Sequence, residues 1–127
     1  MPRYHIWFST KRRKWLLEGD VAGTAERAIW DVARNDGIRL LECQTAIDHV
    51  HLMVELGSAL ELPATMKALK GKSARTVFQE IDGLKMDART EHLWQRGYGW
   101  KLVPPGADAT VRRYIRTQMD RLEKFER

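Results

Sequence analysis

The stretch AIDHVHLMVEL, residues 46–56, constrains the fold of this chain more than any other segment. Its aliphatic residues from Val50 to Leu56 occupy every second position, which is the pattern of a β-strand with one face in a core. The same alternation places His49 and His51 side by side on the other face. Two neighbouring imidazoles suit metal binding, but this spacing also occurs by chance, so a structural histidine pair stays an alternative.

The other segments predict an alternation of strands and helices. Strands are expected over Arg3–Thr10, Ile38–Ile47, His49–Leu56 and about Tyr98–Val103, and helices over Val21–Asn35, within residues 57–81 and over Ala109–Phe125. The order β-α-β-β-α-β-α indicates an α+β fold of the ferredoxin-like or RRM-like split βαβ type. We therefore expect an antiparallel four-stranded sheet with helices on one face and an added C-terminal helix that carries a tyrosine.

Each expected helix has an apolar stripe at helical spacing, which predicts the face that packs on the sheet. The three stripes are Val21, Ala25, Ala28, Ile29 and Val32, then Met66, Leu69, Ser73 and Val77, then Val111, Ile115, Met119 and Leu122. Asp20 is the expected N-cap of the first helix, and Gly37 is its expected end.

Length, charge and cysteine content limit the number of domains, the kind of partner and the kinds of site that this chain can have. A length of 127 residues predicts a single domain, 1–127, and a net charge of +5 favours a polyanionic partner. The lone cysteine, Cys43, excludes a disulfide within the chain and a cysteine-based zinc site, and its strand context predicts a buried, unreactive thiol. No apolar run is long enough to span a membrane, and the N-terminal charges follow the apolar stretch instead of preceding it, so we expect a cytoplasmic protein.

The last helix combines with the histidine strand into one possible mechanism. Tyr114 and Gln118 lie four residues apart, so they share a helix face. A tyrosine hydroxyl can attack a phosphodiester, but its ordinary pKa of about 10 means that it needs a nearby base or positive charge. A divalent metal held by His49, His51 and Gln118 would polarise the phosphate. Mg²⁺ or Mn²⁺ would serve, and the imidazoles suit Mn²⁺ better.

Five blocks of sequence resemble one family. They are YHIWFSTKRRK, DHVHL, MKALKGKSAR, LWQRGY and YIRTQ, in this order along nearly the whole chain. The chain resembles the single-tyrosine HUH transposases, which move small insertion sequences as single-stranded DNA and have the REP-associated tyrosine transposases as close relatives. One departure is Gly99, which stands where that family usually has an aromatic residue.

The resemblance implies roles for particular residues and partners. Tyr114 would be the nucleophile, forming a 5′-phosphotyrosine link and releasing a 3′-hydroxyl, and His49, His51 and Gln118 would bind the divalent metal. Members of the family recognise imperfect DNA hairpins at transposon ends and work as homodimers, in which the tyrosine helix can serve the site of the other subunit.

Basic and aromatic residues elsewhere are candidate DNA contacts, through phosphate pairing or base stacking. The candidates are Lys11, Arg12, Arg13, Lys67, Lys70, Lys72, Arg75, Trp94, Arg96, Tyr98, Trp100 and Arg113. For each of them, plain solvation or packing is the alternative.

Three other hypotheses stay open from the sequence. A domesticated relative could process repeated palindromes in a host genome. An RRM-like nucleic-acid-binding module would carry out no chemistry and would need none of the histidines or Tyr114. A structural protein could keep its histidine pair in the core.

Overall fold

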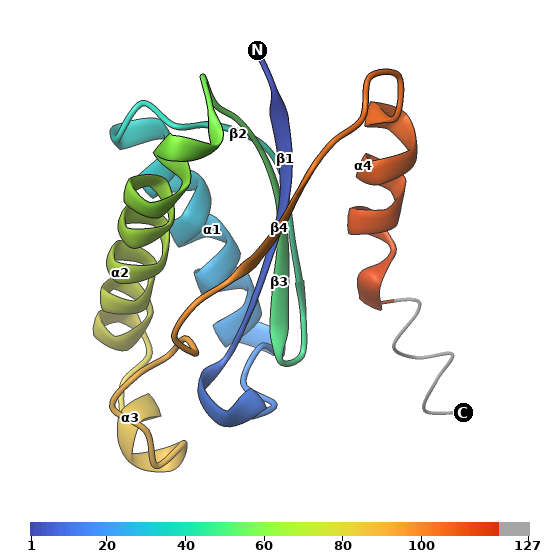
Figure 1. Ribbon diagram of the computed structural model, residues 1–127. Helices are drawn as coiled ribbons and strands as arrows, with labels where there is room; N and C mark the ends of the chain where they lie inside the picture. The colour runs from blue at the N-terminus through green and yellow to red at the C-terminus, as the bar shows by residue number, and fades with distance from the viewer. Residues whose placement is uncertain (120–127) are drawn as a thin grey trace.

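The computed structural model describes residues 1–119 and contains one antiparallel four-stranded sheet (Figure 1). Its strands are β1 (Arg3–Ser9), β2 (Arg39–Ala46), β3 (His49–Glu55) and β4 (Gly99–Leu102). They lie in the order β2-β3-β1-β4. The two central strands, β1 and β3, are thus the first strands of the two βαβ units, β1-α1-β2 and β3-α2-β4, as in a ferredoxin-like fold. The predicted fold class is confirmed.

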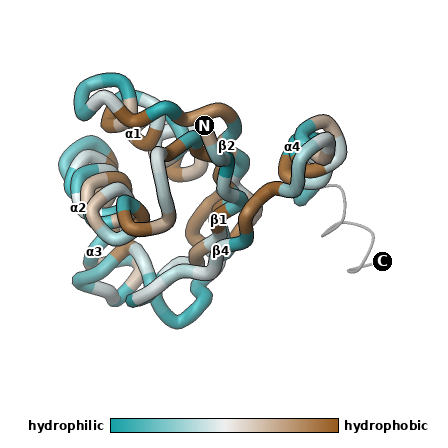
Figure 2. The backbone as a smooth tube through the Cα atoms, turned by 45° about the horizontal axis from the view of Figure 1, so that its top comes forward, coloured by the Kyte–Doolittle hydropathy of each residue, from teal (hydrophilic) through white to brown (hydrophobic). Residues whose placement is uncertain are grey.

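Helices cover both faces of this sheet. The longer helices are α1 (Gly19–Asn35), α2 (Leu62–Glu80) and α4 (Asp108–Arg116), and the short ones are η1 (Lys11–Arg13), η2 (Ala59–Glu61) and α3 (Leu84–Asp87). Figures 1 and 2 show α1 and α2 together on one side of the sheet and α4 alone on the other. No helix within residues 1–119 is both long and apolar enough to cross a membrane.

The start of α1 differs from the prediction. The helix begins at Gly19, and its N-cap is Glu18, whose side chain makes no capping hydrogen bond. Asp20, the expected cap, lies inside the first turn instead. A carboxylate in the first turn interacts favourably with the helix dipole, so Asp20 stabilises the start of α1 through its charge and not as the N-cap.

The end of the last helix also differs. Helix α4 ends at Arg116, a turn at Thr117 follows, and Gln118 and Met119 are helical again, whereas the sequence predicted one continuous helix. Its predicted end at Phe125, and Leu122 of its stripe, lie outside the described residues. A helix of nine residues is too short to be stable alone, so α4 depends on its packing against the sheet.

The main core lies between the sheet and the pair α1 and α2. Alternate residues of β1 and β3, such as Ile6 and Leu52, are fully buried there, and the predicted stripes of the two helices pack on them. In α2 every predicted stripe residue is buried. Cys43 is buried as predicted, and burial raises the pKa of its thiol, which disfavours the reactive thiolate.

A smaller cluster fixes α4 on the opposite face. Ile115 is fully buried against Met53 of β3, with Val103 beside them. Burying one such side chain stabilises by about 1.5–3 kcal/mol. Met53 follows His49 and His51 at every second position of β3, so it lies on the same face of the sheet. The contact between Met53 and Ile115 therefore places α4 over the two histidines.

Candidate active site between the sheet and helix α4

Strand β3 places the two histidines on the face that α4 covers. His51 is buried at 7% exposure, and His49 is half-buried. The turn before β3 supplies Asp48, which forms an ion pair with Arg13 at 3.0 Å. The predicted face-sharing of the histidines is therefore present, and their ring centroids lie 5.0 Å apart.

Each histidine has a second partner at its Nδ1 atom. His51 Nδ1 lies 2.8 Å from Nε2 of His5, a residue of β1, and His49 Nδ1 lies 2.8 Å from Oδ1 of Asp48. When Nδ1 donates the proton of each bond, the Nε2 atom of each ring keeps its lone pair. Partners of this kind hold the tautomer and orientation of metal-binding histidines.

The surroundings of His51 and His5 favour their neutral forms. Burial, followed by the neighbouring His49 and His5, lowers the pKa of His51 to about 3. Burial and then Lys101 lower the pKa of His5 below its usual range. Neutral imidazole is the form that binds a metal ion, so these rings need no deprotonation at neutral pH.

Asp48 remains a carboxylate beside them. Burial by itself would raise its pKa, but hydrogen bonds from His49 and Arg13 outweigh burial and leave the pKa lowered. A negative charge is thus available to accept the Nδ1 proton of His49.

Tyr114 of α4 lies above this cluster. Its ring centroid is 5.7 Å from that of His5 and 5.8 Å from that of His51, both in edge-on geometry. The side chain is 39% exposed. Beneath it lies a cavity of about 630 Å³, whose lining residues are His5, Trp7, His51, Lys101, Thr110, Val111 and Tyr114.

Gln118 is the remaining residue of the predicted metal set. It is buried at 7% exposure, and its Nε2 donates to the carbonyl oxygen of Tyr114 at 2.8 Å. The amide oxygen is therefore the end that could bind a cation. Among residues 1–119 no three His, Cys, Asp or Glu side chains are grouped as a metal site, so a metal ion on His49 and His51 would need an amide or water as its further ligand. Two imidazoles and one amide oxygen would suit Mn²⁺ better than Mg²⁺, which prefers oxygen ligands.

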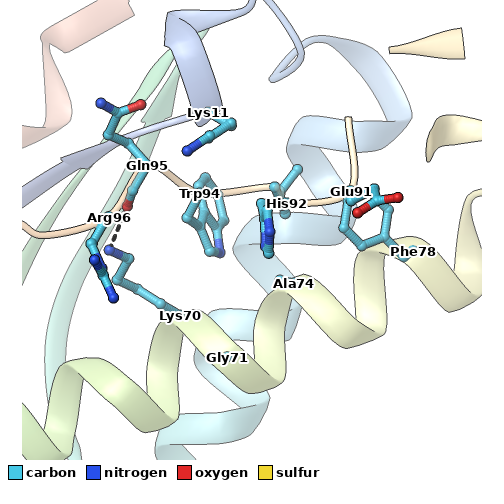
Figure 3. Close-up of a pocket in the computed structure, with 11 residues that line it drawn as sticks. Lys11, Lys70, Gly71, Ala74, Phe78, Glu91, His92, Trp94, Gln95 and Arg96 are labelled. Carbon is cyan, nitrogen blue, oxygen red and sulfur yellow. Dashed lines mark hydrogen bonds between the residues drawn. The ribbon is translucent and has the colours of Figure 1, made fainter. Parts of the chain in front are cut away.

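Several predicted DNA contacts gather on the other side of the sheet, away from Tyr114. They line a second cavity between α2 and the segment that leads to β4 (Figure 3), with a volume of about 550 Å³. Its cations are Lys11, Lys70 and Arg96. These predicted DNA contacts therefore lie apart from the cavity beneath Tyr114.

Two of the predicted contacts have internal partners. Lys70 donates from Nζ to the carbonyl oxygens of Gln95 (2.7 Å) and Gly97 (2.6 Å), and the first bond is drawn in Figure 3. Lys72 forms an ion pair with Asp36 at 2.6 Å. Both ammonium groups therefore tie segments of the fold together.

Trp94 was a candidate for base stacking, with plain packing as the alternative. It is 6% exposed and packs edge-on against Phe8, with ring centroids 4.9 Å apart. Its indole Nε1 donates to Ser73 Oγ, a predicted stripe residue of α2. Its apolar ring and its single donor are thus both used inside the core.

The other candidates lie nearer to solvent. Tyr98 is half-buried against the main core, and Trp100 is 44% exposed at the edge strand β4. The exposed cations of the predicted set are Arg12, Arg13, Lys67, Lys72, Arg75, Arg96 and Arg113.

Three residues of the site were missed at the sequence level: His5, Trp7 and Lys101. Antiparallel pairing aligns Trp7 with His51, and His5 with Lys101. The alternation of RYHIWFS already separates His5 and Trp7 from the core-facing residues of β1. That alternation, with β1 placed beside β3, was the signal that could have found them.

The chain is similar in sequence to transposases from two bacteria. The chain is 31% identical over 118 residues to the ISDra2 transposase TnpA of Deinococcus radiodurans, an alignment that covers 93% of this chain and 84% of the relative. It is 29% identical over 122 residues to the transposase for insertion sequence element IS200 of Salmonella typhimurium, with coverage of 93% and 77%.

Solved structures agree with these relatives. A crystal structure from Deinococcus radiodurans R1, described as that of a transposase, matches with a TM-score of 0.74 and 30% identity, over 93% of this chain and 92% of that one. The REP-associated tyrosine transposase bound to a REP hairpin matches with a TM-score of 0.62 over 90% of this chain and 64% of that one. At 14% identity this second likeness concerns the fold alone.

The family itself is shown by the length of its match. Residues 2–118, almost the whole described structure, match the family of IS200-like transposases. The five sequence blocks, the ferredoxin-like sheet and the named relatives agree with that match. This chain therefore belongs to the IS200-like transposase family.

Proposed function

We propose that this transposase cleaves and rejoins single-stranded DNA through Tyr114. The observation that supports the proposal is the approach of Tyr114, from α4, to His51, from β3, with ring centroids 5.8 Å apart. Ile115 packs α4 on the sheet, and that packing does not require a tyrosine at the neighbouring, more exposed position 114. A phenol beside the neutral imidazole of His51 is a nucleophile next to a candidate metal ligand.

The proposed step exchanges one phosphodiester for another. Tyr114 Oη loses its proton and attacks the phosphorus, so that a Tyr–O–P bond forms while the P–O3′ bond breaks. The departing O3′ takes up a proton and becomes a 3′-hydroxyl, and the phosphate stays on the 5′ side of the downstream strand. Attack by a 3′-hydroxyl on that phosphotyrosine reverses the step, so rejoining needs no nucleotide cofactor.

We propose His49, His51 and Gln118 as the protein ligands of a divalent metal, Mg²⁺ or Mn²⁺. Bound there, the ion would act as a Lewis acid on the phosphate oxygens. The chain itself contributes two rings whose Nδ1 atoms are held by His5 and Asp48, which orients their Nε2 atoms. His49→Ala should then weaken metal binding and cleavage together.

We further propose that the substrate is a DNA hairpin and that the active form is a homodimer. The REP-associated tyrosine transposase, which shares the fold, was solved with a REP hairpin bound. The exposed cations supply positive charge for phosphates, and the net charge is +5. Binding through phosphates predicts that affinity falls steeply as salt rises.

A covalent-trapping assay tests the chemistry. The protein is mixed with a labelled library of randomised single-stranded hairpins and Mn²⁺, then separated on a denaturing gel. A shifted band that requires both Tyr114 and the metal is expected, and sequencing the trapped DNA would identify the cleavage site.

The controls separate the alternatives. Tyr114→Phe should bind hairpins without forming the band, because it lacks only the nucleophilic oxygen. Binding without a band in the unmodified protein would favour a non-catalytic RRM-like module. Cleavage that survives Tyr114→Phe would remove this residue from its role. If the trapped DNA sequences match palindromes that are repeated across the host genome, a domesticated relative would be favoured.

A further inference from the structure

Trp7 of β1 lies in a row of side chains that crosses the sheet next to the nucleophile. The antiparallel register pairs Trp7 with His51 on one side and with Gly99 on the other. Residues in direct cross-strand register share a face of the sheet. Trp7 is therefore on the α4 face, between a candidate metal ligand and the edge strand.

Gly99 makes room for the indole. A Cβ atom built on Gly99 would overlap Cε2 and Nε1 of Trp7, so any other residue would displace the ring. Gly99 is not among the glycines with a positive φ, so space and not backbone conformation requires glycine here.

The neighbours of Trp7 hold its ring in place. One side of the indole is against the backbone of β4 at Gly99, and His5 lies 5.1 Å away between ring centroids. The ring is half-exposed, and it lines the cavity of about 630 Å³ beneath Tyr114. An aromatic surface that is fixed on one side and open on the other is a stacking platform.

The charge beside this platform favours one kind of occupant. Lys101 lines the same cavity from β4 and is exposed, so its ammonium group can pair with a phosphate. A flat ring, a cation and a tyrosine hydroxyl thus surround one space. Stacking on the ring needs a base that is not already stacked in a duplex, which single-stranded DNA provides.

We infer that Trp7 stacks on the unpaired nucleobase next to the scissile phosphate, with Lys101 on the adjoining backbone. This inference rests on the proposed function, because it takes Tyr114 as the nucleophile. Stacking accepts any base, so Trp7 would fix the position of the strand and not its sequence. Its loss should weaken binding of a single strand by about tenfold to a hundredfold, as is typical for one base–aromatic stack.

The test uses a binding signal that needs no cleavage. Full-length protein carrying Tyr114→Phe is titrated, with a chelator present, into a short single-stranded oligothymidylate that has 2-aminopurine at its centre. Quenching of 2-aminopurine fluorescence is expected on binding. It should be lost in Trp7→Leu and retained in Trp7→Phe, which keeps an aromatic ring.

Gly99→Ala supplies a second variant that keeps the tryptophan but displaces it, and it should reduce the quenching as well. Trp15→Leu is the matched control, because Trp15 is 63% exposed and does not line the cavity. Quenching that persists in Trp7→Leu and Gly99→Ala would overturn the inference. So would a loss confined to Trp100→Leu, because Trp100 pairs with Ile6 and lies on the opposite face of the sheet.

The two proposals fail in different ways. Covalent trapping without Trp7-dependent quenching would keep the tyrosine chemistry and reject the stacking. Trp7-dependent quenching without covalent trapping would keep the stacking site and reject the chemistry.

Discussion

The Nε2 atom of His5 lies 2.8 Å from the Nδ1 atom of His51, which joins the two central strands of the sheet at the candidate active site. The two residues are diagonal neighbours, because His51 is in register with Trp7 and His5 with Met53. Their rings stack with centroids 5.1 Å apart. His5 thereby determines which nitrogen of His51 can face a ligand.

His5→Ala is expected to weaken Mn²⁺ binding by about tenfold to a hundredfold, as is usual when the hydrogen-bond partner of a metal-binding histidine is removed. The reason is that His51 loses the group that fixes its tautomer and ring orientation. Calorimetric titration with Mn²⁺ measures this directly. His92→Ala, at an exposed position in the other cavity, should bind as tightly as the unmodified protein. Equal affinity for His5→Ala would show that His51 is oriented by packing alone.

The metal-free protein is expected to lose stability as pH falls below about 6.5. Burial lowers the pKa of His51 to about 3 in the folded state, whereas the unfolded chain has the ordinary value of about 6.5. Between these values the unfolded state binds more protons, so stability is fully present above pH 6.5 and declines towards pH 3. We expect a decrease of about 1–3 kcal/mol between pH 7 and pH 4 from this residue. Urea unfolding of the protein and of His51→Gln measures it, and identical pH slopes would contradict the assignment.

Glu42→Ala is expected to loosen α4 without unfolding the sheet. The buried carboxylate of Glu42 on β2 accepts hydrogen bonds from Arg116 at 2.5 Å and 3.2 Å and from Arg112 at 3.4 Å. Removing it takes away these hydrogen bonds, while Ile115 stays buried and the ion pair between Arg3 of β1 and Asp108 of α4 remains. Amide hydrogen exchange in α4 should accelerate several-fold, with the exchange of β1 and β3 unchanged.

The matched control for that variant is Glu80→Ala. Glu80 pairs with Arg27 at 2.8 Å, but both side chains are about half exposed, and surface pairs of this kind contribute little. Unchanged α4 exchange in Glu42→Ala would mean that the apolar contact of Ile115 and the Arg3–Asp108 ion pair hold the helix without Glu42.

Lys70→Met is expected to reduce stability by about 1–2 kcal/mol, because two carbonyl oxygens lose a charged donor. Lys70 ties residues 95 and 97 to α2, so the segment before β4 should also become more accessible to protease. Thermal unfolding and limited proteolysis check both effects. Lys67→Met, at an exposed position of the same helix, should leave stability within about 0.5 kcal/mol of the unmodified value. Similar behaviour of the two variants would assign Lys70 to the solvated surface.

Much of this molecule follows from local pattern. Period-two alternation separates His49 and His51 from the core-facing residues of β3, and period-3.6 spacing identifies the buried face of α2. These patterns are visible in the sequence because each is imposed by backbone geometry over a few residues. Tyr114 and Gln118 share a helix face for the same reason. The order of the elements then indicates the ferredoxin-like fold.

Contacts between segments remote in sequence were decided by the tertiary structure. No local rule brings His5 to His51, places Gly99 beneath Trp7, or directs the indole of Trp94 into the core towards Ser73. Those neighbours depend on the order and register of the four strands and on the docking of α4 through Ile115 and Glu42, and such pairings arise only when the whole sheet is assembled. The sequence by itself therefore determined the chemical groups and the face each occupies on its element. The tertiary structure decided which of those faces meet around one cavity.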